Sequence, residues 1–144
     1  MRDFPIVDLD FIQSLIPQKK PFVMVEHFLN YSDKNITSSL EIREENILVE
    51  NQHLTASGLI EHMAQTVALH TGYNYYLQNK TAPTGYIGAI KSVEIASLPR
   101  IGTIIQTTAH ILQEFMGVTL VDIHAEINGK VIAKAQMKTV IQTV

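Results

Sequence analysis

Glu61 is an acidic side chain placed where it can exchange protons with a bound substrate. It lies in 54–78, the only long stretch whose apolar residues recur at the three- and four-residue spacing of a helix. Thr55 or Ser57 can cap this helix, which puts Glu61 near the positive end of the helix dipole and its unpaired N–H groups. Gln65 lies one turn further on the same side, where it can hydrogen-bond to Glu61 or to a substrate. Alternatively, Glu61 faces solvent and only stabilises the dipole, by about 0.3–1 kcal/mol.

Three of the histidines are candidates for acid–base or metal chemistry with Glu61. His53 precedes Glu61 by eight residues in a loop, where it can act as a general base or simply be solvated. His62 follows Glu61 directly, so their side chains diverge by about 100° and form no acid–base pair. We interpret His62 as part of a substrate channel wall or of a dimer contact. His70 shares a face with His62 but lies about 12 Å along the helix, too far for one metal ion, so we expect no metal site.

The composition restricts the classes of function that the chain can have. At 144 residues and 46% hydrophobic content, residues 1–144 are expected to form a single domain. The net charge is −3 and the 11 basic residues are dispersed, so we expect binding neither to nucleic acid nor to a membrane surface. The absence of cysteine excludes disulfides, thiolate metal sites and a cysteine nucleophile. Without a signal-peptide pattern or a membrane-length apolar run, the expected location is cytoplasmic.

The segments before the central helix predict a short helix and a β-hairpin. Asp8 can cap a helix at about 8–16, which we interpret as a lid or plug. In segment 21–31, apolar residues occupy both sets of alternate positions, which predicts a strand covered on both sides. Segment 36–42 alternates between apolar and polar residues and predicts the strand that pairs with it. The charged, aperiodic segment 43–52 is expected to connect this hairpin to the central helix.

The segments after the central helix, itself expected at about 56–78, predict further strands. Segment 85–97 alternates well enough to be one strand, and 104–112 is rich in β-forming residues. Segments 119–127 and 130–140 flank Asn128-Gly129, a strong signal for a tight hairpin turn. These strands predict a three- or four-stranded meander.

A hairpin, a long apolar helix and a meander satisfy the rule that secondary structure packs in layers if one curled antiparallel sheet wraps the helix. This layout predicts an α+β domain of the hotdog type. Such a sheet leaves an edge strand open, and two copies that pair edge to edge would cover it. We therefore expect a homodimer or a larger homo-oligomer.

Three stretches of the sequence resemble motifs of the 3-hydroxyacyl-[acyl-carrier-protein] dehydratases of the hotdog superfamily. Residues 59–65, LIEHMAQ, resemble the LxxEAMAQ start of the central helix in that family. Residues 16–26, IPQKKPFVMVE, resemble LPHRxPFLLVD. Residues 85–102 resemble a glycine-led strand that ends in a proline-and-glycine turn, with one extra residue here. Together these matches cover most of the chain in the family's order.

The resemblance implies a dimer with sites shared between its subunits, and an acyl chain that lies in a channel along the central helix. The substrate would be carried on the phosphopantetheine arm of an acyl carrier protein, with no further cofactor. A histidine would take the α-proton, and Glu61 would act as the acid for the departing β-hydroxyl. Backbone N–H groups at the helix start, where Gly58 stands, would polarise the thioester carbonyl. Gln65 and His62 would complete the substrate-binding residues.

Two positions depart from the family's pattern. The segment that carries the catalytic histidine, of GHFPG type, corresponds to 50–56, ENQHLTA, which has neither glycine nor proline. The histidine of LPHRxPF is replaced by Gln18. These departures resemble a subgroup of dehydratase-like proteins encoded with aryl-polyene pathways, in which the histidine segment is degraded while the central helix is retained.

Three functions are consistent with these residues. The first is a dehydratase of fatty acid or aryl polyene biosynthesis, which converts a 3-hydroxyacyl thioester to a trans-2-enoyl thioester with Glu61 as acid and His53 or a partner's histidine as base. The second is a non-catalytic subunit that forms a heterodimer with an active dehydratase. The third, ranked below both, is an acyl thioesterase in which Glu61 activates water.

Overall fold

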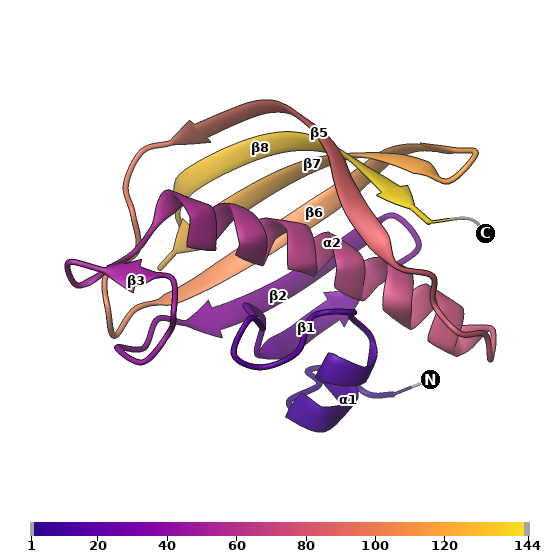
Figure 1. Cartoon of the computed structure of the whole chain (residues 1–144), viewed down its shortest axis with the longest axis horizontal. Coiled ribbons are helices and arrows are strands. Elements are labelled where there is room, and N and C mark those ends of the chain that lie inside the picture. Colours follow the sequence, from indigo (N-terminus) through magenta and orange to yellow (C-terminus); the bar gives the residue numbers. More distant parts are fainter. Residues whose placement is uncertain (1, 143–144) are drawn as a thin grey trace.

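Residues 2–142 are described by the computed structural model, in which an antiparallel sheet curls around a long helix (Figure 1). The helices are α1 (Leu9–Ser14) and α2 (Ala56–Leu77). The strands of the main sheet are β1 (His27–Tyr31), β2 (Asn35–Glu41), β5 (Gly85–Ile95), β6 (Ile104–Phe115), β7 (Val118–Ile127) and β8 (Lys130–Ile141). A separate hairpin comprises β3 (Val49–Glu50) and β4 (His53–Leu54). Within the described part of the chain, no helix is long and apolar enough to cross a membrane.

The six strands of the main sheet follow the order β1-β2-β6-β7-β8-β5, and every neighbouring pair is antiparallel. Figure 1 shows α2 lying across one face of this sheet, so the predicted α+β arrangement is confirmed. The alternative of a four-stranded meander is wrong. β5 does not pair with β6, because β2 occupies that side of β6. β5 pairs instead with β8, at the edge of the sheet. The meander therefore consists of β6, β7 and β8.

Tight turns close both hairpins of the meander. Asn128 and Gly129 have φ angles of 50° and 80°, which confirms the turn predicted from the Asn-Gly pair. The turn between β6 and β7 uses Met116 and Gly117 in the same way, with φ angles of 51° and 79°. The sequence did not predict this second turn, because methionine rarely adopts a positive φ.

The apolar segment 21–31 forms a strand only over its last five residues, His27–Tyr31, which corrects the prediction of one long strand. The reason is that the helix, not a neighbouring strand, satisfies the backbone of its first half. The N–H of Met24 donates to the side chain of Gln65, and the carbonyl of Met24 accepts from the ring of His62. Because its polar groups already have partners on α2, this segment has no need of a place in the sheet.

The central helix begins and ends with well-formed caps. Thr55 is the N-cap, and its hydroxyl oxygen accepts a hydrogen bond of 3.2 Å from the N–H of Gly58. The helix ends at Leu77, and Asn79 then adopts a left-handed φ of 56° that reverses the chain.

The short helix α1 packs against the C-terminal half of α2. Asp8 caps it as predicted, with its carboxylate 3.2 Å from the N–H of Phe11. The chain that follows α1 passes so close to Gly72 that a Cβ there would lie 2.0 Å from the backbone oxygen of Leu15. Gly72 is therefore the residue that lets the two helices meet.

Replacing Gly72 by alanine tests this contact, because helix propensity and the contact predict opposite changes in the free energy of unfolding. Helix propensity alone favours alanine by about 1 kcal/mol. The clash with Leu15 instead predicts that Gly72→Ala lowers the free energy of unfolding by about 1–3 kcal/mol in urea titrations. Gly85→Ala is the matched control, because a Cβ at Gly85 meets its nearest atom at an ordinary 3.8 Å. A Gly72→Ala protein as stable as the wild type would contradict the proposed packing.

Candidate functional site

Glu61 lies in the wall of a cavity of about 320 Å³ between α2 and strands β5 and β8. We call this the Glu61 cavity. Small side chains of α2, Ala64 and Ala68, leave room beside the helix, while Gln18 and Ile87 also line the cavity. The other lining residues are Leu15, Pro17, Val67, Thr71, Gly72, Ala82, Pro83, Gly85, Tyr86, Thr139, Val140 and Ile141. A carboxylate thus faces a largely apolar cavity that runs along the helix.

The side chain of Gln65 fixes the Glu61 carboxylate. One N–H of its amide donates to Glu61 Oε2 over 2.7 Å, and the other donates to the carbonyl of Phe22 over 2.9 Å. Its oxygen accepts the N–H of Met24 over 2.6 Å. Gln65 is fully buried, and these three bonds determine which end of the amide is the oxygen. The predicted contact between Glu61 and Gln65 is therefore present in the structure.

His62 lies in the core, on the side of α2 that faces the sheet. Its Nδ1 is 2.7 Å from the carbonyl of Met24, and its Nε2 is 2.8 Å from the hydroxyl of Thr107 on β6. Because a carbonyl can only accept, Nδ1 carries the proton and Nε2 accepts from Thr107. Burial lowers the pKa of His62 to about 4, so the ring is neutral. The interpretation of His62 as a channel-wall or substrate-binding residue is thus corrected, because it has no exposed surface and both ring nitrogens have partners.

The structure does not bring His53 into the Glu61 cavity. His53 lies on β4, just before the N-terminus of α2, and its Nδ1 is 2.8 Å from the carbonyl of Asn51. It is half-buried, and it is absent from the walls of the Glu61 cavity. No other histidine of residues 2–142 lines that cavity. A proton acceptor for a substrate beside Glu61 must therefore come from another chain or from another residue type.

Gly58 has a structural role at the start of α2. Its N–H already donates to Thr55, and a Cβ at this position would lie 2.5 Å from Leu54 Cδ1. It does not line the Glu61 cavity either. The proposed role of its N–H in polarising a thioester carbonyl would require the helix cap to open.

Gln18 is a residue of the cavity that the sequence did not mark as a binding residue. Its side-chain oxygen is buried and has no hydrogen-bond partner within residues 2–142. Gln18 lines the Glu61 cavity, so its amide can bond to a polar group of a bound molecule. The sequence feature that could have marked Gln18 is its place in the 16–26 motif, where the dehydratase family has a histidine.

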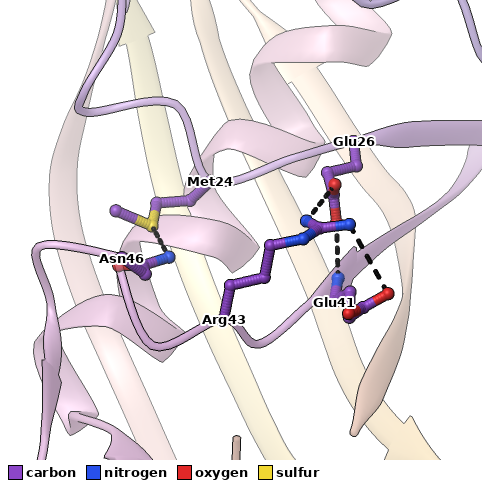
Figure 2. A network of polar contacts seen from close by, with 5 residues as sticks. All are labelled: Met24, Glu26, Glu41, Arg43 and Asn46. Atoms are coloured by element: carbon purple, nitrogen blue, oxygen red, sulfur yellow. Dashed lines mark hydrogen bonds and ion pairs between the residues drawn. The ribbon is translucent and has the colours of Figure 1, made fainter. Parts of the chain in front are cut away.

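An ion-pair network holds the segment that carries Met24 against the loop leading to β3 and β4 (Figure 2). Arg43 pairs with Glu26 and lies 3.5 Å from Glu41. Glu26 also accepts the backbone N–H of Glu41 over 2.6 Å. The side-chain amide of Asn46 donates to the sulfur of Met24 at 3.3 Å. These contacts hold the segment whose backbone Gln65 also binds.

The described residues contain no group of three or more His, Asp or Glu side chains that could hold a metal ion. The polar side chains that line the Glu61 cavity are those of Glu61, Gln18, Thr71, Tyr86 and Thr139.

A curled antiparallel sheet around one long helix defines this chain as a hotdog-fold protein, as solved structures of that fold confirm. The family model of the ApeP-like proteins, described as ApeP dehydratase, matches residues 11–143, and the chain belongs to this family. The match confirms the dehydratase resemblance seen in the three motifs. A search of curated proteins found no match.

Similar solved structures come from several bacteria. The dehydratase heterocomplex ApeI:P from Xenorhabdus doucetiae matches with a TM-score of 0.88 and 16% identity, over 99% of this chain and 93% of that chain. An HP0420-homologue from Helicobacter felis matches with a TM-score of 0.71 and 14% identity, over 100% and 94%. A hypothetical thioesterase with coenzyme A from Streptococcus pneumoniae matches with a TM-score of 0.62 and 10% identity, over 78% and 85%. At these identities the likeness shows the fold alone.

The buried, neutral His62 makes stability depend on pH in a defined direction. Its folded-state pKa of about 4 lies below the ordinary value of 6.5, so the unfolded chain binds more protons between these values. The free energy of unfolding should therefore fall as the pH drops from 6.5 towards 4, by up to about 3 kcal/mol from this residue. Burial also lowers the pKa of His70, which adds a contribution of the same sign.

Urea titrations at several pH values measure this slope. His62→Gln should flatten it, whereas His53→Gln should keep it because His62 is unchanged. An unaltered slope in His62→Gln would mean that another group causes the acid sensitivity.

Proposed function

We propose that this protein binds 3-hydroxyacyl thioesters in the Glu61 cavity and takes part in their dehydration to trans-2-enoyl thioesters. The observation that carries the proposal is the Glu61 carboxylate, held by Gln65 at the wall of an apolar cavity along α2. Membership of the ApeP dehydratase family supports the reaction class. The substrate would be delivered by an acyl carrier protein, whose flexible arm suits a cavity that opens at the protein surface.

The elimination assigns a definite role to Glu61. A base removes the α-proton, and the electron pair of that C–H bond forms the double bond between the α- and β-carbons. The bond from the β-carbon to oxygen breaks, and a protonated Glu61 gives its proton to the departing hydroxyl, which leaves as water. Gln65 binds Oε2, which leaves Oε1 to hold the transferred proton. Gln18, which also lines the cavity, can orient the substrate hydroxyl.

The base is proposed to come from a second subunit. No histidine of residues 2–142 lines the Glu61 cavity, whereas β5, which borders it, is an edge strand of the sheet. Tyr86 and Ile90 on β5 are 54% and 45% exposed, which is high for large apolar side chains. A chain that pairs along β5 would cover these residues and could bring a histidine to the cavity.

Two kinds of second subunit fit this arrangement. In a homodimer, the base would be His53 of the partner subunit. In a heterodimer, it would be a histidine of an active dehydratase. The heterodimer is favoured because the segment around His53 lacks the glycines and proline of the family's histidine motif. The similar Xenorhabdus structure is itself a dehydratase heterocomplex.

Glu61→Gln tests the assignment of the acid. With a 3-hydroxyacyl carrier-protein thioester as substrate, and with the partner dehydratase present if one is required, the variant should lose at least about 100-fold in kcat. Glutamine keeps the shape and a hydrogen bond to Gln65, so binding and folding should persist. Glu44→Gln, an exposed site outside the cavity, is the matched control. Undiminished turnover in Glu61→Gln would exclude Glu61 as the acid.

His53→Ala, measured with and without a second dehydratase from the same source, tests the origin of the base. If the partner supplies it, the purified protein alone should be inactive, the mixture active, and His53→Ala without effect on the mixture. If His53 supplies it, the protein alone should be active and His53→Ala should abolish that activity. An active protein that His53→Ala leaves unchanged would contradict both assignments.

A further inference from the structure

Gln18 carries a hydrogen-bond acceptor that is buried without a partner. Its side-chain oxygen is the one buried side-chain nitrogen or oxygen of residues 2–142 that makes no hydrogen bond. An unpaired buried oxygen destabilises a protein, because the oxygen loses its bonds to water on folding. Native structures contain few such groups, and a role in function is one reason for keeping them. Because Gln18 lines the Glu61 cavity, its oxygen is a candidate for bonding to a ligand there.

The backbone next to Gln18 is held by the same side chain that holds Glu61. The N–H of Phe22 donates to the carbonyl of Lys19 over 2.8 Å, which closes a turn directly after Gln18. The Cα atoms at the two ends of such a turn lie within about 7 Å of each other. The carbonyl of Phe22 accepts from one N–H of Gln65, and the other N–H of Gln65 donates to Glu61. One buried amide therefore sets the positions of the acid and of the turn that follows Gln18.

Glu61 and Gln18 offer different groups to the third carbon of an acyl thioester. Protonated Glu61, which the proposed elimination requires, donates to an oxygen on that carbon. The side-chain oxygen of Gln18 can only accept. A hydroxyl satisfies both residues, because its oxygen accepts from Glu61 while its O–H donates to Gln18. A 3-oxo group accepts from Glu61 but places a second acceptor against Gln18, and the third carbon of a trans-2-enoyl group offers neither bond.

We propose that Gln18 is the residue that selects a 3-hydroxyacyl thioester over the 3-oxoacyl and 2-enoyl thioesters of the same chain. This inference rests on the proposed function, because it takes the C3 hydroxyl to lie beside Glu61. The terminal torsion of a glutamine side chain is soft, so the oxygen can turn towards the hydroxyl while the backbone stays in place. The bond to Gln18 is lost when the hydroxyl leaves as water, so the site holds the substrate more tightly than the product.

The test measures the binding of three pantetheine ligands by titration calorimetry. All three have the same acyl chain, with a hydroxyl, an oxo group or two hydrogens at the third carbon. An amide replaces the thioester in each, which makes the α-proton too weakly acidic for elimination. The wild type should bind the hydroxyl ligand at least about 10-fold more tightly than the oxo ligand.

Gln18→Met keeps the length of the side chain and removes its acceptor oxygen. The preference for the hydroxyl ligand over the oxo ligand should fall by about 10-fold in this variant, because Glu61 still donates to both ligands. Gln13→Met is the matched control, since Gln13 lies on α1 and does not line the Glu61 cavity. The melting temperature of Gln18→Met should equal or exceed that of the wild type, because the lost oxygen bonds to no described residue. A marked fall would show that the oxygen has a structural role and would overturn the inference.

The binding outcomes separate this inference from the proposed function. If the ligands bind but Gln18→Met keeps the wild-type preference, selection by Gln18 is refuted while the proposed function stands. If Gln18→Met weakens all three ligands equally, Gln18 binds the pantetheine arm, which also refutes selection at the third carbon. A wild-type preference for the oxo ligand would show that the amide presents its N–H groups instead, with the same consequence. If no ligand binds the wild type, the proposed function fails and this inference fails with it.

Discussion

The structure depends on a short stretch of backbone that hydrogen-bonds to the side chains of a helix. Gln65 binds the N–H of Met24 and the carbonyl of Phe22, and His62 binds the carbonyl of Met24. His62 and Gln65 are three residues apart, which places them on neighbouring turns of α2 within reach of one extended segment. Met24, His62 and Gln65 are fully buried, so each bond between them that failed to form would leave an unpaired polar atom at a cost of about 1–3 kcal/mol. The segment, the helix and the Glu61 carboxylate are therefore held together.

α2 meets three different neighbours because the side chains on its faces differ in size and polarity. Towards the sheet, His62 bonds to Thr107, while Thr66 shares a hydrogen bond of 2.7 Å with Ser38 on β2. Towards the cavity, the side chains are small, and a substrate can lie beside the helix. Towards α1, Gly72 removes the side chain altogether. Each face of α2 therefore carries side chains that suit the neighbour it meets.

Periodicity predicted the faces of the elements but not all of their partners. The central helix, the Glu61–Gln65 contact and the Asn128–Gly129 turn follow from local spacing, which acts within a few residues. The place of β5 beside β8 depends on a crossover that no local pattern encodes. The same holds for Met24, whose apolar surroundings predict a strand although α2 satisfies its backbone. His62 was misplaced because a histidine with two buried hydrogen bonds has the same local sequence as one that faces a channel. Gln18 was missed because an unpaired amide is visible only once its neighbours are placed.

We propose that an acyl thioester lies along α2 with its reacting carbons beside Glu61. Nuclear Overhauser contacts between a bound, non-hydrolysable 3-hydroxyacyl pantetheine analogue and methyl-labelled alanines measure this directly. We expect contacts from the acyl chain to Ala64 and Ala68, which line the Glu61 cavity, and none to Ala96, which is exposed on the connection after β5. A ligand that binds tightly but shows no contact to Ala64 or Ala68 would contradict it.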